Sequence, residues 1–128
     1  MNAKLQELLP MIEDRLQKDD ISEFKVGKTT NEVERFNDDE YDTYEYASII
    51  ACSDNPKLIA GAEADLIQHF QSHLVLKNKC KNMNKGSAGN PDATKLYIIA
   101  MGKNPRKGME MLLDKFPLFK DLVICKLL

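Results

Sequence analysis

Gly27, Lys28 and Thr29 are the residue types with which a phosphate-binding P-loop ends. A complete P-loop needs another glycine five positions before the second one, and this chain has Ser22 there. Glu23, which lies inside the same stretch, would also bring a negative charge towards a nucleotide phosphate. The sequence therefore argues against a nucleotide-binding P-loop at this turn.

Arg35 follows the turn on a predicted short helix, between the apolar residues Val33 and Phe36. A guanidinium group is planar and suits bidentate contacts with a phosphate, so Arg35 is a candidate phosphate ligand. The alternative is a surface arginine that forms an ion pair with Glu32 or Asp39.

Glu63 shares one face of a predicted helix with Ile59, Ile67 and Phe70. A carboxylate in an apolar stripe is costly unless it is paired, protonated or bound to a cation. We therefore consider Glu63 a candidate ligand of a divalent metal ion. The alternative is a partly exposed glutamate at the edge of the stripe, paired with a lysine.

Two polar segments add further candidates. The acidic stretch 37–46 contains Tyr41 and Tyr44, and is either a solvated loop or a cation-binding loop. The stretch 77–86 is rich in lysine and asparagine, which can contact phosphates, although a flexible solvated loop is the alternative. Lys25 and Lys28, which lie just before and within the Gly-Lys-Thr segment, are further candidates. The candidate nucleic-acid ligands are therefore Lys25, Lys28, Lys77, Asn78, Lys79, Lys81, Asn82, Asn84 and Lys85.

Periodicity predicts the elements that must position these side chains. The predicted helices are residues 3–18, about 30–36, 56–73 and 104–116, and the predicted strands are residues 21–28, 44–53, 95–102 and the tail 122–128. Pro10 predicts a break or kink in the first helix. Thr29 and Glu32 have the spacing of a capping box at the start of the second. The pattern is that of one mixed α/β domain.

Composition narrows the classes of function. The chain has 128 residues, 43% of them hydrophobic and 30% charged, and its formal net charge is −2. No global basic field indicates a nucleic-acid partner, so local patches must carry that prediction. Its three cysteines are spaced singly, without a zinc-binding or disulfide pattern. Neither a signal peptide nor a membrane span is predicted, so we expect an intracellular, cytoplasmic protein with no membrane partner.

Taken together, these motifs resemble the GIY-YIG nuclease superfamily over residues 24–90. The segment "KVGKT" ends like a YIG strand at Gly27, and Arg35 follows eight residues later. The segment "AEADLIQHF" supplies Glu63, and "KNKCKNMNKGSAG" supplies an asparagine before a glycine-rich turn. The asparagine is Asn78, Asn82 or Asn84. Three features depart from the family: no GIY strand precedes Phe24, Lys25 replaces the YIG tyrosine, and Asp39 stands four residues after Arg35, where the family often has histidine or tyrosine.

The resemblance implies a fold and an activity. The fold would be a small α+β domain over residues 1–128, with a mixed or antiparallel sheet of three to four strands flanked by helices and an N-terminal helical extension over about 1–20. The activity would be Mg²⁺- or Mn²⁺-dependent endonucleolytic cleavage of nucleic acid, with DNA expected. Arg35 would hold the phosphate, Glu63 the metal ion, and Tyr41 or Tyr44 would help to activate water. Because the GIY strand is absent and Lys25 replaces the YIG tyrosine, an inactive nucleic-acid-binding or protein-interaction module is the alternative.

Overall fold

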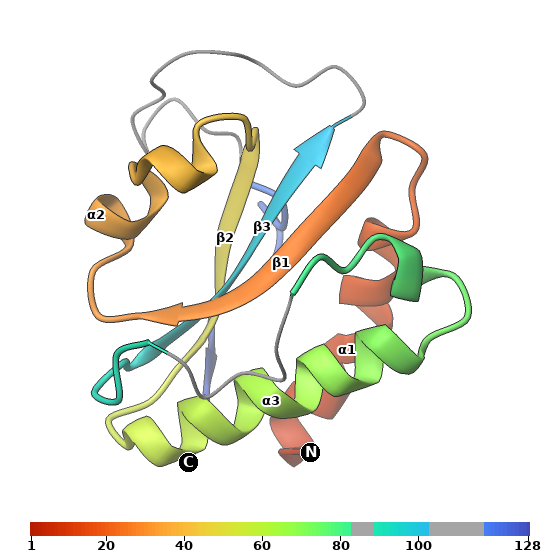
Figure 1. Cartoon of the computed structure of the whole chain (residues 1–128). Helices are drawn as coiled ribbons and strands as arrows, with labels where there is room; N and C mark the ends of the chain where they lie inside the picture. The colour runs from red at the N-terminus through yellow and green to blue at the C-terminus, as the bar shows by residue number, and fades with distance from the viewer. Residues whose placement is uncertain (83–88, 103–116) are drawn as a thin grey trace.

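The structure is a computed structural model that describes residues 1–82, 89–102 and 117–128. Its described part is an α+β fold in which helices flank a four-stranded sheet (Figure 1). The helices are α1 (Ala3–Leu16), α2 (Glu32–Phe36) and α3 (Pro56–Ser72), with the single 3₁₀ turns η1 (Asp39–Tyr41) and η2 (Leu76–Asn78). The strands are β1 (Ile21–Thr29), β2 (Tyr46–Cys52), β3 (Lys95–Gly102) and β4 (Cys125–Lys126). The predicted fold class is confirmed.

The sheet has the strand order β1-β3-β2-β4. Strand β3 pairs antiparallel with both β1 and β2, and β4 pairs parallel with β2. The register places Gly27 of β1 opposite Tyr97 of β3. Because β3 is central, it is buried along almost all its length, which explains its continuous apolar sequence.

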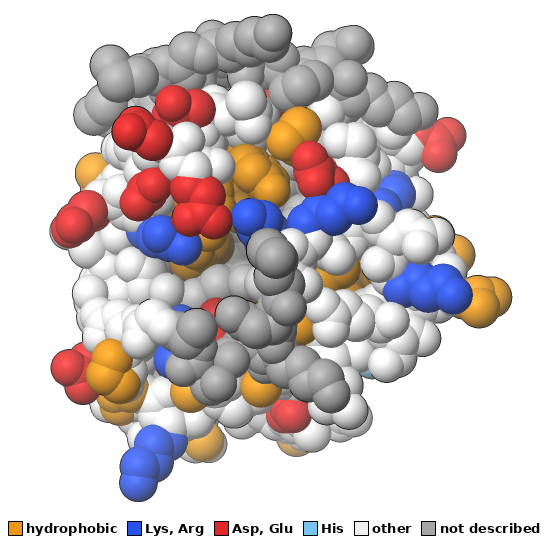
Figure 2. Space-filling model, in the orientation of Figure 1, with side chains coloured by type: hydrophobic (Ala, Val, Ile, Leu, Met, Phe, Trp, Pro, Cys, Tyr) orange, Lys and Arg blue, Asp and Glu red, His pale blue; other side chains and the backbone are white. Residues whose placement is uncertain are grey.

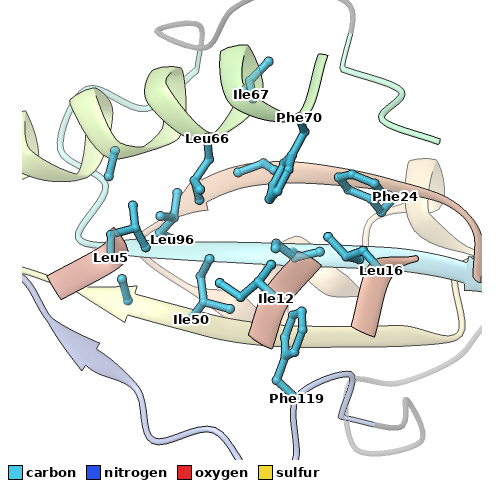
Figure 3. Packing of buried hydrophobic residues seen from close by; sticks show 14 of the residues in the cluster. Leu5, Ile12, Leu16, Phe24, Ile50, Leu66, Ile67, Phe70, Leu96 and Phe119 are labelled. Carbon is cyan, nitrogen blue, oxygen red and sulfur yellow. The ribbon is translucent and has the colours of Figure 1, made fainter. Parts of the chain in front are cut away.

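The two faces of the sheet carry different cores, because successive side chains of a strand point to opposite faces. On one face, Leu96 and Ile98 of β3 belong to the large cluster formed with α1 and α3 (Figure 3). On the other face, Tyr97 and Ile99 belong to a smaller cluster with Phe36 of α2 and the residues around η1. The candidate residues Arg35 and Tyr41 are therefore attached to the second face.

Helix α1 belongs to the main core. Leu5, Ile12 and Leu16 are fully buried in the same cluster as the sheet, and each such burial contributes roughly 1.5–3 kcal/mol. These contacts lie on both sides of Pro10, and the helix runs from Ala3 to Leu16 with the proline inside it. Of the break or kink predicted at Pro10, the break is therefore wrong, since packing on both sides offsets the missing backbone donor.

The start of α2 differs from the predicted capping box. Asn31 is the N-cap, and its side chain accepts a hydrogen bond from the backbone N–H of Glu34. The hydroxyl of Thr29 instead bonds the backbone N–H and carbonyl of Asn31. Thr29 thus ends β1 and turns the chain, and the helix that carries Arg35 begins at Glu32.

The other predicted elements agree with the structure to within a few residues where it describes them. Asn55 caps α3 through the backbone N–H of Lys57, with Pro56 at the first helical position, as the sequence predicts. The predicted tail strand is confirmed only for Cys125–Lys126. The predicted helix 104–116 lies outside the described residues. None of the described helices has the length and apolar character needed to cross a membrane.

Candidate functional site

A cleft of about 490 Å³ brings most of the predicted site residues together. It is lined by four cationic side chains, two carboxylates and two tyrosines. These are Lys25, Lys28, Arg35, Lys81, Glu40, Glu63, Tyr41 and Tyr97. Figure 2 shows acidic side chains gathered beside Lys and Arg side chains on one face of the molecule. Arg35 and Glu63, which come from α2 and α3, therefore line the same cleft, and the charged residues that line it sum to +2.

Arg35 is held by two tyrosine hydroxyls. Its Nε donates to the hydroxyl of Tyr97 and its Nη2 to the hydroxyl of Tyr41, each at 3.0 Å. The guanidinium carbon also lies 4.8 Å from the centre of the Tyr41 ring, within cation–π range. Burial, the largest single influence, acts to lower the pKa of Arg35, but the hydrogen bond to Tyr97 and the electrostatic interactions with Tyr97, Tyr41 and Glu40 together raise it. Arg35 is therefore a fixed cation at the cleft.

The two tyrosines form a buried hydroxyl pair. Their oxygens lie 2.8 Å apart, so one hydroxyl donates to the other. Burial is the main cause that raises the pKa of both Tyr41 and Tyr97 above the usual tyrosine value. Both are therefore neutral hydroxyls at neutral pH, suited to hold Arg35 and to donate hydrogen bonds rather than to act as strong bases.

Of the two tyrosines predicted to activate water, the structure brings Tyr41 into the cleft. Tyr44 packs against the Tyr41 ring, with 5.5 Å between the ring centres, but it does not line the cleft. Burial raises the pKa of Tyr44 to about 12.

Tyr97 is the site residue that the sequence analysis missed. Its ring lies across Gly27, and a Cβ atom at position 27 would be 2.3 Å from both Cζ and the hydroxyl oxygen of Tyr97. A glycine inside a strand does signal a close approach, but the approaching residue belongs to a strand 70 positions later. Although Lys25 replaces the expected tyrosine of β1, the neighbouring strand places Tyr97 beside Gly27.

Glu63 is 5% exposed and lines the cleft from α3. Its negative charge is a minor contributor to the raised pKa of Tyr97. Mg²⁺ is typically bound by one or two carboxylates with waters and substrate phosphates, and one buried carboxylate in an open cleft fits that donor set. Across residues 1–82, 89–102 and 117–128, no three His, Cys, Asp or Glu side chains are grouped so that they alone could hold a metal ion.

Of the three asparagines that the sequence proposes, Asn82 lines the cleft, Asn78 does not, and Asn84 lies outside the described residues. The side chain of Asn82 mimics a strand partner of Val26, accepting from the backbone N–H at 2.9 Å and donating to the carbonyl at 2.8 Å. The main chain of residues 79 and 81 pairs with Phe24 in the same way. Residues 79–82 therefore run along the edge of β1 and complete the wall of the cleft, which explains the position of Asn82.

The predicted nucleic-acid ligands divide into three groups. Lys25, Lys28 and Asn82 line the cleft, together with Lys81. Lys77, Asn78 and Lys79 do not; Lys79 instead donates to the carbonyls of Leu16 and Lys18, at the end of α1. Asn84 and Lys85 lie outside the described residues.

Comparison of the chain with family models, with curated proteins and with solved structures found no match in any of the three. The resemblance to the GIY-YIG superfamily therefore stays a prediction from the sequence of this chain.

Proposed function

We propose that this protein is a metal-dependent endonuclease that hydrolyses nucleic-acid phosphodiester bonds in the cleft between α2, β1 and α3. The observation that supports the proposal best is that Arg35 and Glu63, 28 positions apart in the sequence, line one cleft. A phosphate-binding cation and a buried carboxylate for a divalent ion are the two parts that this chemistry needs in advance.

In this proposal, Arg35, Lys25 and Lys28 bind the phosphodiester and stabilise the charge that develops on its oxygens. The hydroxyls of Tyr41 and Tyr97 hold the guanidinium in one orientation. A water oxygen forms a bond to phosphorus while one phosphorus–ester oxygen bond breaks. The water loses a proton to solvent, and the departing oxygen gains one and leaves as a hydroxyl group.

Glu63 is the residue that would hold Mg²⁺ or Mn²⁺, with waters and the substrate phosphate as the other ligands. When bound, such an ion would supply stabilisation of the negative charge on the leaving oxygen. Burial of Glu63 within the cleft wall keeps its carboxylate in one position, which a rigid helix such as α3 supports.

A nucleic-acid-binding module without cleavage is the second candidate. It is favoured by the raised pKa values of Tyr41 and Tyr97, which leave both hydroxyls neutral and poorly suited to take a proton from water. Loss of a general base typically lowers a rate by about 10²–10⁴-fold. The cleft of such a module would keep its cations and bind the same ligand.

Cleavage of supercoiled plasmid tests the proposal. Nicking is expected with Mg²⁺ or Mn²⁺ and not with EDTA. Glu63→Gln and Arg35→Lys should each abolish it. Suitable controls are Asp65→Asn on the same helix and Arg15→Lys, whose side chains lie outside the cleft in exposed or partly exposed ion pairs.

Circular dichroism must show that every variant is folded. No nicking by the folded wild-type protein with either metal would refute the endonuclease. Retention of nicking in either cleft variant would refute the assignment of that residue. Binding of labelled DNA or RNA without cleavage would favour the second candidate. A protein-interaction module would be indicated if neither nucleic acid bound.

A further inference from the structure

Glu40 lies in the cleft between two of the cations that a phosphate group needs. One carboxylate oxygen is 3.3 Å from Nζ of Lys25, and the other is 3.7 Å from Nη2 of Arg35. The 3₁₀ turn η1 sets this position, because the side chain of Asp38 accepts a hydrogen bond from the backbone N–H of Glu40. The carboxylate therefore bridges the two cations from the rim of the cleft.

A phosphate would compete with this carboxylate for the same donors. Both groups are anions that accept hydrogen bonds from ammonium and guanidinium groups, and two anions in one place repel each other. The Glu40 side chain is 51% exposed and can rotate away, whereas the next residue, Tyr41, is held by its buried ring and its bond to Tyr97. Displacement therefore requires movement of one side chain and leaves the rest of the site in position.

We propose that Glu40 is a built-in competitor of the phosphate ligand, and that it sets both the affinity of the cleft for nucleic acid and the salt dependence of that affinity. The inference rests on the proposed function only for the nature of the ligand, a nucleic-acid phosphate, and does not require cleavage. Glu40→Gln keeps the shape of the side chain and removes its charge, so the lining charge of the cleft rises from +2 to +3.

Metal-free binding tests this inference. Fluorescence anisotropy in EDTA would compare wild type, Glu40→Gln and Asp39→Asn on a labelled single strand and on the corresponding duplex. Asp39→Asn is the matched control, because Asp39 is an exposed neighbour in the same turn that does not line the cleft. Both variants change the net charge by the same amount, so only the position of the charge differs.

Two exposed ion pairs are lost in Glu40→Gln, so its affinity should rise about two- to tenfold at about 50 mM salt. The slope of log affinity against log salt should steepen by about 0.7–0.9, because the net positive charge that the cleft offers to the phosphates rises by one. Asp39→Asn should change the affinity by less than about twofold, since its charge lies outside the cleft and is screened.

Four results would overturn the inference. These are an unchanged or weaker affinity of Glu40→Gln, an equal gain in Asp39→Asn, loss of Mg²⁺-dependent cleavage with unchanged metal-free affinity, and no binding by any of the proteins. The last result would overturn this inference and leave the proposed function to the plasmid assay with Mg²⁺ or Mn²⁺. Tighter binding by Glu40→Gln in a protein that cleaves nothing would refute the endonuclease alone and support the inference.

Discussion

Gly27→Ala is the substitution whose effect follows most directly from the geometry. A Cβ atom at position 27 would lie 2.3 Å from Cζ and from the hydroxyl oxygen of Tyr97, far inside ordinary contact distance. The ring cannot simply move into solvent, because Tyr97 is 1% exposed and packs edge-on against Phe36 with 5.0 Å between ring centres. Tyr97 must therefore leave its place, or β1 and β3 must separate.

The expected cost follows from the contacts that are lost. The hydrogen bond from Arg35 to Tyr97 involves a charged donor, and such bonds contribute about 1.5–3 kcal/mol. The bond between Tyr41 and Tyr97 is neutral and contributes about 0.5–1.5 kcal/mol. Alanine also reduces the conformational entropy of the unfolded chain, which offsets about 0.4–1 kcal/mol of this cost where the backbone is not strained. Position 27 meets that condition, because the described glycine with positive φ is Gly89 and not Gly27. We expect Gly27→Ala to lower the free energy of unfolding by about 1–4 kcal/mol.

Urea unfolding in two backgrounds tests this reasoning. In Tyr97→Leu, the atoms that clash are gone, so adding Gly27→Ala should cost less than about 1 kcal/mol. Tyr97→Phe keeps Cζ and Cε2, which lie 2.3 and 2.8 Å from the new Cβ, so it should not relieve the cost. Gly61→Ala is the matched control, because nothing lies within 4 Å of its Cβ, and in the middle of α3 it should stabilise by about 0.5–1 kcal/mol. Equal costs of Gly27→Ala in the wild-type and Tyr97→Leu backgrounds would refute the proposed steric coupling.

Three further predictions concern residues around the cleft. Because burial raises the pKa of Tyr44 to about 12 in the folded protein, against about 10 when unfolded, stability should be fully present below about pH 10 and fall as pH rises towards 12. Tyr44→Phe should flatten that fall in urea titrations, and an identical fall in the variant would contradict the assignment. Asn82→Ala removes the side-chain donor and acceptor that bond the Val26 backbone, so the free energy of unfolding should fall by about 1–3 kcal/mol. Hydrogen exchange at the Val26 amide should become faster, and unchanged exchange would contradict this prediction. Lys79→Met should lower the free energy of unfolding by about 1–2 kcal/mol, because it removes the hydrogen bonds to the end of α1, but it should not weaken nucleic-acid binding. Lys28→Met should weaken binding, because Lys28 lines the cleft. If anisotropy showed weaker binding for Lys79→Met than for Lys28→Met, the assignment of Lys79 to the fold and of Lys28 to the cleft would be rejected.

Local sequence patterns predict most of the fold, because hydrophobic periodicity and capping residues depend only on the residues of one helix or strand. Asn55 and Pro56 fix the start of α3, and the apolar run 95–102 fixes β3 as a buried strand. The errors occur where contacts between residues far apart in the sequence determine the local structure. Pro10 does not end α1 because core residues on both sides of it hold the helix.

The candidate site was predicted only in part, for the same reason. Arg35 and Glu63 stand out locally as charged residues beside apolar ones. Tyr97 does not, because a tyrosine in a buried strand is ordinary until the register sets it opposite Gly27. The role of Glu40 likewise cannot be predicted from the acidic stretch in which it occurs, because it depends on the contact between η1 and Lys25 of β1.

The register of β1 against β3 therefore links the stability of the fold to the proposed chemistry. A slip of one residue would turn the side chain of Tyr97 to the opposite face of the sheet and remove it from Arg35. Gly27 permits the one register in which the tyrosine ring can lie across β1 and still reach the guanidinium. In the proposed function, the Gly-Lys-Thr segment at the end of β1 would thus serve the phosphate site indirectly, since its glycine admits the ring that orients the arginine while Lys28 lines the same cleft.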